Sequence, residues 1–332
     1  MSETGKRQEA ISESKAGGAS VPASQPVSNS TMPSSPNERA WRRFRRNRLA
    51  RISAWFLAGV VLLVLLWPLV TPHNPDALSD NQFQPPSTKH WFGTDVHGRD
   101  VFTRVMYGAQ ISLLVGIVGA GVSLVIGVTW GATAGYVGGR TDSTMMRFVD
   151  ILYSLPSIIF VIVLITTLEG VLKNWLAATG SPTLAKSARL IFLFVGLGAV
   201  SWLTMARIVR GQVLSLRSRQ FVDASRVLGA GPVWILRHHI IPNVLGVVIV
   251  YLTLTVPAII LYESFLSYLG LGIQPPMASW GSLIAEGAEQ INPIRIYWWL
   301  IIFPGGVLVL TLLALNFLGD GLRDAWDVRG GK

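Results

Sequence analysis

Apolar blocks long enough to cross a lipid bilayer dominate this chain of 332 residues. A membrane-spanning helix needs roughly 20 predominantly apolar residues, because hydrocarbon offers no hydrogen-bond partner to an open backbone. Six blocks meet this condition, at about Ile52–Val70, Ile111–Ala134, Met145–Leu168, Leu190–Ile208, Val244–Leu269 and Tyr297–Leu318. The sequence therefore predicts an all-α integral membrane protein with six transmembrane helices and both termini on one side.

The net charge of +10 is distributed unevenly over this topology. Of the 28 Lys and Arg residues, 21 fall in the termini, in residues 39–51 and in the loops on the same side, whereas 7 fall on the opposite side. Because positively charged loops stay in the cytoplasm, both termini are predicted to be cytoplasmic. The charge is thus explained by topology and by contact with membrane lipid headgroups, and no nucleic acid partner is expected.

Three regions follow from composition. Residues 2 to about 36 contain almost no large apolar side chain, so a disordered cytoplasmic tail is predicted, and the region 1–51 ends in an Arg-rich juxtamembrane segment. A transmembrane domain is predicted for residues 52–318, with an external loop at about 71–110 and a cytoplasmic loop at about 209–243. Residues 319–332 are predicted to form a cytoplasmic C-terminal tail.

Local motifs in and between the spans are predicted to have structural roles. In Gly93-Thr-Asp-x-x-Gly-Arg-Asp100, the charged side chains are expected to cap a helix and to pair locally. The second span carries small residues that allow close approach to another helix, at Gly116, Gly119, Gly121, Gly127 and Gly131. Prolines inside or near spans, at Pro156, Pro257 and Pro304, are expected to bend helices.

Residues for catalysis or cofactor binding are not predicted anywhere in the chain. The sequence contains neither a Gly-x-x-x-x-Gly-Lys-Ser/Thr motif for ATP phosphates nor a His pair with zinc-binding spacing, and it has no Cys. Glu263 is the deepest ionisable residue. Three roles are open for it: lining a translocation path, a hydrogen-bonded packing role, or a position in the outer interface.

The cytoplasmic loop at about 209–243 is the most informative part of the sequence. A loop with this charge cannot lie in hydrocarbon, so it must offer a surface on one membrane face, where docking of another protein is its expected role. Its basic residues, with those that border it, are Arg207, Arg210, Arg217, Arg219, Arg226 and Arg237.

Within this loop, Asp223-Ala-Ser-x-x-x-Gly229 followed by His239-x-Ile-Pro242 resembles the "EAA" loop of binding-protein-dependent ABC importer permeases. Further motifs look like the second permease subunit of the oligopeptide/dipeptide branch. They are Gly93–Asp100, Met146-Arg-x-x-Asp150, Met205–Gly211, Glu263–Gly270 and Asn316–Asp324. The resemblance covers about residues 40–329. The chain has Asp-Ala-Ser where the family usually has Glu-Ala-Ala, and Ile241 where it usually has Leu.

The resemblance implies a type I ABC importer permease in a bacterial cytoplasmic (inner) membrane. It implies pairing with a homologous permease subunit, docking of two ATPase subunits that use ATP and Mg, and delivery of peptide by an extracytoplasmic binding protein. This chain itself would bind no cofactor. The loop would form a coupling helix that docks on the ATPase through Asp223, Ala224, Arg226, Gly229, Arg237, His239 and Pro242, and Gly229 would permit a sharp turn.

Two other classes of function remain open at this point. A self-contained channel or secondary transporter would need charge pairs or ion-selective rings in several spans, and only Glu263 and Asp150 qualify. A membrane scaffold without transport would leave the motifs on the outer side without a role.

Overall fold

The computed structural model describes residues 36–71, 74–179, 182–275 and 277–326, of which residues from Ala40 onward belong to one compact unit. The tail predicted to be disordered therefore lies, except for its last residue, outside the described residues. Helices make up the regular structure that is described, apart from one isolated β-bridge between Thr94 and Asp100. The predicted all-α class is confirmed.

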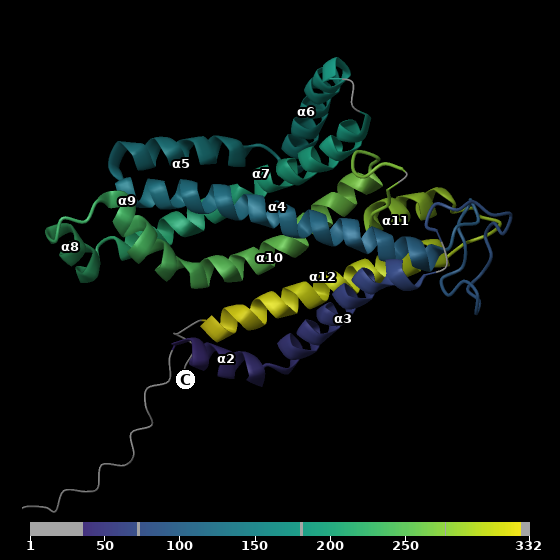
Figure 1. The fold of residues 1–332 in the computed structure, drawn as a ribbon, viewed down its shortest axis with the longest axis horizontal. Helices are drawn as coiled ribbons and strands as arrows, with labels where there is room; N and C mark the ends of the chain where they lie inside the picture. The colour runs from purple at the N-terminus through teal and green to yellow at the C-terminus, as the bar shows by residue number, and fades with distance from the viewer. Residues whose placement is uncertain (1–35, 72–73, 180–181, 276, 327–332) are drawn as a thin grey trace, which may run out of the picture. The chain divides into compact units, whose positions relative to one another are not determined.

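Most of the described chain is helical, and the helices range from short turns to long membrane-spanning stretches (Figure 1). In chain order they are α2 (Pro36–Arg46), α3 (Arg48–Val70), α4 (Val101–Val137), α5 (Gly139–Ser154), α6 (Ser157–Thr179), α7 (Pro182–Leu216), α8 (Gln220–Val227), α9 (Pro232–Ile235), a π-helical turn η2 (Leu236–Ile240), α10 (Ile241–Tyr268), α11 (Trp280–Glu289) and α12 (Trp299–Trp326).

Four helical stretches are long and apolar enough to cross a membrane: α3, α4, the run Pro232–Tyr268 and α12. A fifth span results if α5 and the start of α6 are counted as one bent unit, with a bend of 94°. The described residues therefore give four to five candidate spans where the sequence predicted six. The difference arises in the third and fourth apolar blocks. The third block contains the 94° bend, and the fourth lies inside α7, which is not among the candidate spans.

The predicted third span is interrupted at Pro156. Helix α5 ends at Ser154, Leu155 is extended with φ −80° and ψ 138°, and α6 begins at Ser157. Proline disfavours a helical conformation in the residue before it, and its ring removes an amide donor. The bend expected at this proline is confirmed, and it separates two helices.

Helix boundaries differ from the predicted loop boundaries at three places. Helix α4 begins at Val101, so the connecting segment ends at residue 100 rather than at about 110. Helix α7 continues to Leu216 and α10 begins at Ile241, which shortens the predicted loop 209–243. Helix α12 continues to Trp326, so part of the predicted C-terminal tail is helical.

These helices extend beyond the predicted apolar blocks because their ends, although they contain polar residues, are buried. Residues 101–110 include Arg104, yet most of their side chains are buried. Near the end of α12, Ala325 packs with Ala40, Phe44 and Ala50 of α2 and α3. A window that averages hydropathy ends at the first charges, whereas packing continues beyond them.

Helix α4 packs along α7 through its glycines, and α10 packs on α4, α7 and α12 (Figure 1). A Cβ atom on Gly131 would collide with the carbonyl oxygen of Ala206, and one on Gly135 would lie 2.9 Å from the carbonyl oxygen of Arg210. The expected close approach of the glycine-rich helix to a neighbour is confirmed, because the two backbones meet where side chains are missing.

Replacing Gly131 with Leu is expected to separate α4 from α7. Overpacking of a tight contact costs about 1–3 kcal/mol or more, so the melting temperature of the purified protein should fall by several degrees. Thermal unfolding in detergent measures this. Gly121→Leu is the matched control, because a Cβ atom at Gly121 meets nothing within 4 Å. Equal melting temperatures for the two variants would contradict this account of the interface.

Candidate functional site

Helices α8 and α9 form a small module at one end of the helix bundle, between the end of α7 and the start of α10 (Figure 1). Val222 of α8 and Ile235 of α9 are fully buried and pack with Val213 of α7 and Ile240 of the π-helical turn. These apolar contacts hold the module on the bundle. The remaining faces of α8 and α9 are free to meet another protein.

Helix α8 ends in a turn that requires glycine. Gly229 has a φ of 83°, its amide donates to the carbonyl of Arg226 at 2.9 Å, and the Ala230 amide donates to the carbonyl of Ser225 at 3.0 Å. These two hydrogen bonds, with Gly229 in the left-handed conformation, form a Schellman motif. Glycine is preferred at this position because it has no Cβ atom to cause strain. The sharp turn predicted at Gly229 is confirmed.

The other residues predicted for docking lie on both halves of the module. Asp223 and Arg226 are exposed on α8 and form an ion pair of 3.0 Å, and Ala224 is exposed between them. Arg237 and Pro242 are exposed on the second half, around the junction of η2 with α10. The structure thus places these residues on a continuous piece of chain that faces away from the core.

His239 has a different environment from the exposed docking candidates. Its ring is partly buried, 6.1 Å from the ring of Phe221 and 5.0 Å from the ring of Trp234, measured between centroids. Its carbonyl accepts a hydrogen bond of 2.6 Å from the Asn243 side chain. His239 therefore joins α8 to α9 by packing, which makes it a positioning residue for the module.

An apolar tip was missed by the sequence analysis. It consists of Val227, Leu228 and Val233, whose side chains are 87%, 86% and 75% exposed. Val227 and Leu228 lie at the end of α8 and Val233 lies in α9, and exposed apolar side chains of this kind are typical of protein interaction surfaces. The signal in the sequence was the apolar pair Val227 and Leu228 directly before Gly229, next to the charged residues Asp223 and Arg226.

A cavity of about 430 Å³ lies between the α5–α6 break, α7 and α10. Its lining combines apolar side chains with hydroxyl groups: Leu152, Tyr153, Leu155, Ser157, Phe160, Val200, Ser201, Leu203, Thr204, Tyr251, Leu254, Thr255, Ala258 and Tyr262. Asp150 pairs at 2.7 Å with Arg207 of α7, whose guanidinium lies 4.1 Å from the ring centroid of Tyr153. Asp142 likewise pairs with Arg210 of α7 at 2.6 Å. These contacts hold α5 against α7 beside the cavity.

Glu263 is fully buried and does not line this cavity. Its carboxylate accepts hydrogen bonds from Ser267 at 2.6 Å and from Ser112 of α4 at 3.3 Å. The Ser112 hydroxyl in turn accepts a bond of 3.2 Å from the backbone amide of Trp280 in α11. Of the three roles left open by the sequence, the hydrogen-bonded packing role fits this geometry, because the network joins α4, α10 and α11.

Glu263→Ala is expected to destabilise the protein more than Glu263→Gln. Alanine leaves two hydroxyl groups without their acceptor, at about 1–3 kcal/mol for each buried group, whereas glutamine retains one acceptor oxygen. Thermal unfolding should therefore show a larger loss for alanine, and transport should follow the amount of folded protein. Normal stability of Glu263→Ala combined with lost transport would instead support a direct role in a translocation path.

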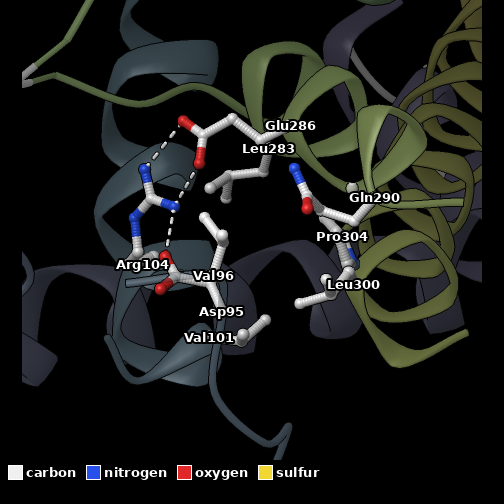
Figure 2. A pocket seen from close by; sticks show the side chains of 10 residues that line it. Asp95, Val96, Val101, Arg104, Leu283, Glu286, Gln290, Leu300 and Pro304 are labelled. Carbon is white, nitrogen blue, oxygen red and sulfur yellow. Dashed lines mark hydrogen bonds and ion pairs between the residues drawn. The ribbon is translucent and has the colours of Figure 1, made fainter. Parts of the chain in front are cut away.

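A second charged cluster joins the connecting segment to α4 and α11, and the sequence analysis missed its contact between Arg104 and α11. Figure 2 shows Arg104 between Asp95 and Glu286, with distances of 2.9 Å to Asp95 and 2.6 Å to Glu286. Asp95 also pairs with Arg99 at 2.7 Å, and Asp100 accepts the amide of Thr103 at 2.8 Å as the cap of α4. The predicted local pairing and capping are confirmed, but the partner Glu286 lies 182 residues from Arg104.

Comparisons with known proteins agree with this arrangement. Residues 127–329 match the family described as binding-protein-dependent transport system inner membrane component, and residues 35–86 match the N-terminal TM domain of oligopeptide transport permease C. The chain is 46% identical over 291 residues to the oligopeptide transport system permease protein OppC of Haemophilus influenzae, covering 87% of each chain. It is 45% identical over 289 residues to the dipeptide transport system permease protein DppC of Bacillus subtilis, covering 87% of this chain and 84% of the relative.

A solved structure of the MetNI methionine ABC transporter in an inward-facing conformation has the same fold. The match has a TM-score of 0.50 at 20% identity and covers 66% of this chain and 94% of the other. By family match, identity and fold, the chain belongs to the binding-protein-dependent transport system inner membrane components, as an ABC importer permease of the oligopeptide and dipeptide type.

Proposed function

We propose that this chain is a permease subunit that moves oligopeptides or dipeptides across a bacterial cytoplasmic membrane by alternating access. In this proposal the chain has the six spans and cytoplasmic termini of a type I importer. It pairs with a homologous permease subunit, two ATPase subunits dock on the module of α8 and α9, and an extracytoplasmic binding protein delivers the peptide. Membership of the permease family argues against the two other functions, a self-contained channel or secondary transporter and a membrane scaffold without transport.

The observation that carries the proposal is the position of the module in the chain. Helix α7 leads into α8, and the run through α9 and η2 leads into α10. Both α7 and α10 line the cavity of about 430 Å³. A displacement imposed on the apolar tip by an ATPase therefore reaches two walls of the cavity directly. Alternating access requires such an element, whose two positions are biased by ATP and by the loaded binding protein.

The lining of the cavity suits peptides of varied sequence. Its volume lies within the range of about 300–1,000 Å³ that small-ligand sites occupy. Tyr153, Thr204, Tyr251 and Tyr262 supply hydroxyl groups, and the lining contains no charged side chain. Hydroxyl groups bond equally to peptide N–H and C=O groups, so the backbone of the cargo is recognised without a fixed requirement for its side chains.

Thr204→Trp tests the proposal by filling the cavity. Thr204 is exposed and lines the cavity, so the indole ring of the introduced tryptophan should occupy cavity space. ATP-dependent uptake of a labelled peptide should fall at least tenfold while the ATPase subunits stay bound. The assay uses vesicles that contain the complete importer and its binding protein. Val125→Trp is the matched control, because Val125 is 64% exposed on α4 and lies outside the cavity lining. Equal loss in both variants, or peptide passage without ATPase subunits, would contradict the proposal.

A further inference from the structure

An apolar groove of about 420 Å³ runs along α3, between α4 and α12. Its lining contains no charged side chain and consists of Trp55, Phe56, Gly59, Val60, Leu63, Val64, Met106, Ala109, Val307 and Leu310. A Cβ atom built on Gly59 meets nothing within 4 Å, so this glycine adds open space to the groove. A groove of this composition in a membrane-spanning region receives hydrocarbon.

Positive charge is concentrated at one end of this groove. Helix α3 begins with Arg48, and Arg51 lies in the same first turn, one turn before Trp55. Both Arg side chains are exposed, and within the part of the chain that the structure describes no carboxylate pairs with either of them. The N-terminus of a helix carries a partial positive charge of its own. Two arginines at this position therefore raise a positive potential that an anion would neutralise.

The length of the groove matches one leaflet of a bilayer. Residues 55–64 extend over about 14 Å of helix, and half of the hydrocarbon core is about 15 Å thick. With the Arg residues at the headgroup level, the groove continues from there toward the middle of the bilayer.

We propose that this groove binds an acyl chain of an anionic phospholipid, whose phosphate-bearing headgroup lies against Arg48 and Arg51. The apolar lining accounts for the chain, and the two arginines account for the charge of the headgroup. The site is separate from the cavity between α5, α6, α7 and α10 and goes beyond the transport of peptide, because its ligand belongs to the membrane itself.

A thiol reporter at the rim of the groove tests this site. The chain has no Cys, so Leu62→Cys supplies a unique thiol on the purified full chain, at a residue that is 58% exposed and next to the lining residue Leu63. A bimane label on this thiol is measured in vesicles that contain a small fraction of brominated phosphatidylglycerol or of brominated phosphatidylcholine with the same acyl chains. We expect quenching at several-fold lower fractions of the anionic lipid.

Two further variants separate the groove from the charge. Arg48→Gln with Arg51→Gln should remove the preference for phosphatidylglycerol, whereas Arg140→Gln with Arg147→Gln, two exposed arginines of α5, should retain it. Gly59→Leu should fill the groove and reduce quenching by the anionic lipid several-fold. Gly121→Leu is its control, because a Cβ atom there also meets nothing within 4 Å.

Several outcomes would overturn the lipid site. Equal quenching by the two lipids, or a preference that survives loss of Arg48 and Arg51, would show that the groove has no selectivity for an anionic headgroup. Quenching that disappears when the labelled chain is assembled with its partner subunits would show that the groove is a protein interface.

Discussion

Uptake of peptide is expected to fall about thirtyfold or more when Val227 and Leu228 are both replaced by Asp. The two side chains are 87% and 86% exposed at the apolar tip, where an ATPase subunit would bury them. Central apolar contacts of an interface contribute about 2 kcal/mol or more each, and a buried carboxylate without a partner adds a desolvation cost. Co-purification of ATPase subunits with the variant, and peptide uptake by vesicles, measure the effect.

The matched control for this variant adds the same charge elsewhere. Thr141→Asp with Ser143→Asp places two carboxylates at exposed positions of α5, outside the module of α8 and α9. Insertion into the membrane should be normal for both double variants, because the buried residues Val222 and Ile235 are unchanged. Normal ATPase binding by the Val227 and Leu228 variant would remove the apolar tip from the docking surface.

The second large effect is expected for Arg104→Met. Arg104 is 4% exposed and pairs with Asp95, which is 5% exposed, and with Glu286. Removing one partner of a buried ion pair costs about 3–5 kcal/mol, because the remaining charges lose their compensation. The melting temperature should fall by on the order of 10 °C, measured by thermal unfolding of the purified protein.

Two comparisons distinguish loss of the ion pair from loss of a positive charge. Arg295→Met removes an exposed arginine from the same side of the predicted topology and should leave the melting temperature unchanged. Combining Arg104→Met with Glu286→Gln should recover part of the lost stability, because one uncompensated carboxylate is then removed. A double variant that is less stable than Arg104→Met alone would contradict this explanation.

The sequence was sufficient for the parts of the fold that depend on hydropathy over one segment. The apolar blocks that correspond to α3, α4, α10 and α12 were identified because each is continuous. The third block was also apolar, but Pro156 divides it into helices bent by 94°. Hydropathy averages over both helices and contains no information on their angle, so the number of spans was not determined by composition.

The candidate site was predicted in outline from the residues around Gly229. The turn was expected from the resemblance to the EAA loop, and glycine at position 229 meets the backbone requirement of such a turn. The positioning role of His239 was not expected, because it depends on the rings of Phe221 and Trp234. The pairing of Arg104 with Glu286 joins residues 182 positions apart, and no pattern within one segment indicates such a contact.

The π-helical turn Leu236–Ile240 sets the angular relation between the module of α8 and α9 and the cavity wall. It lies in an uninterrupted helical run from α9 into α10, and each residue of an α-helix advances the chain by about 100° and 1.5 Å. Removing one residue here would restore regular α-helix and turn α8 and α9 by about a quarter of a revolution relative to Tyr251 and Tyr262. The number of residues between Trp234 and Pro242 therefore matters for function. It determines the direction in which a displacement of α8 and α9 by a partner protein would move the cavity wall.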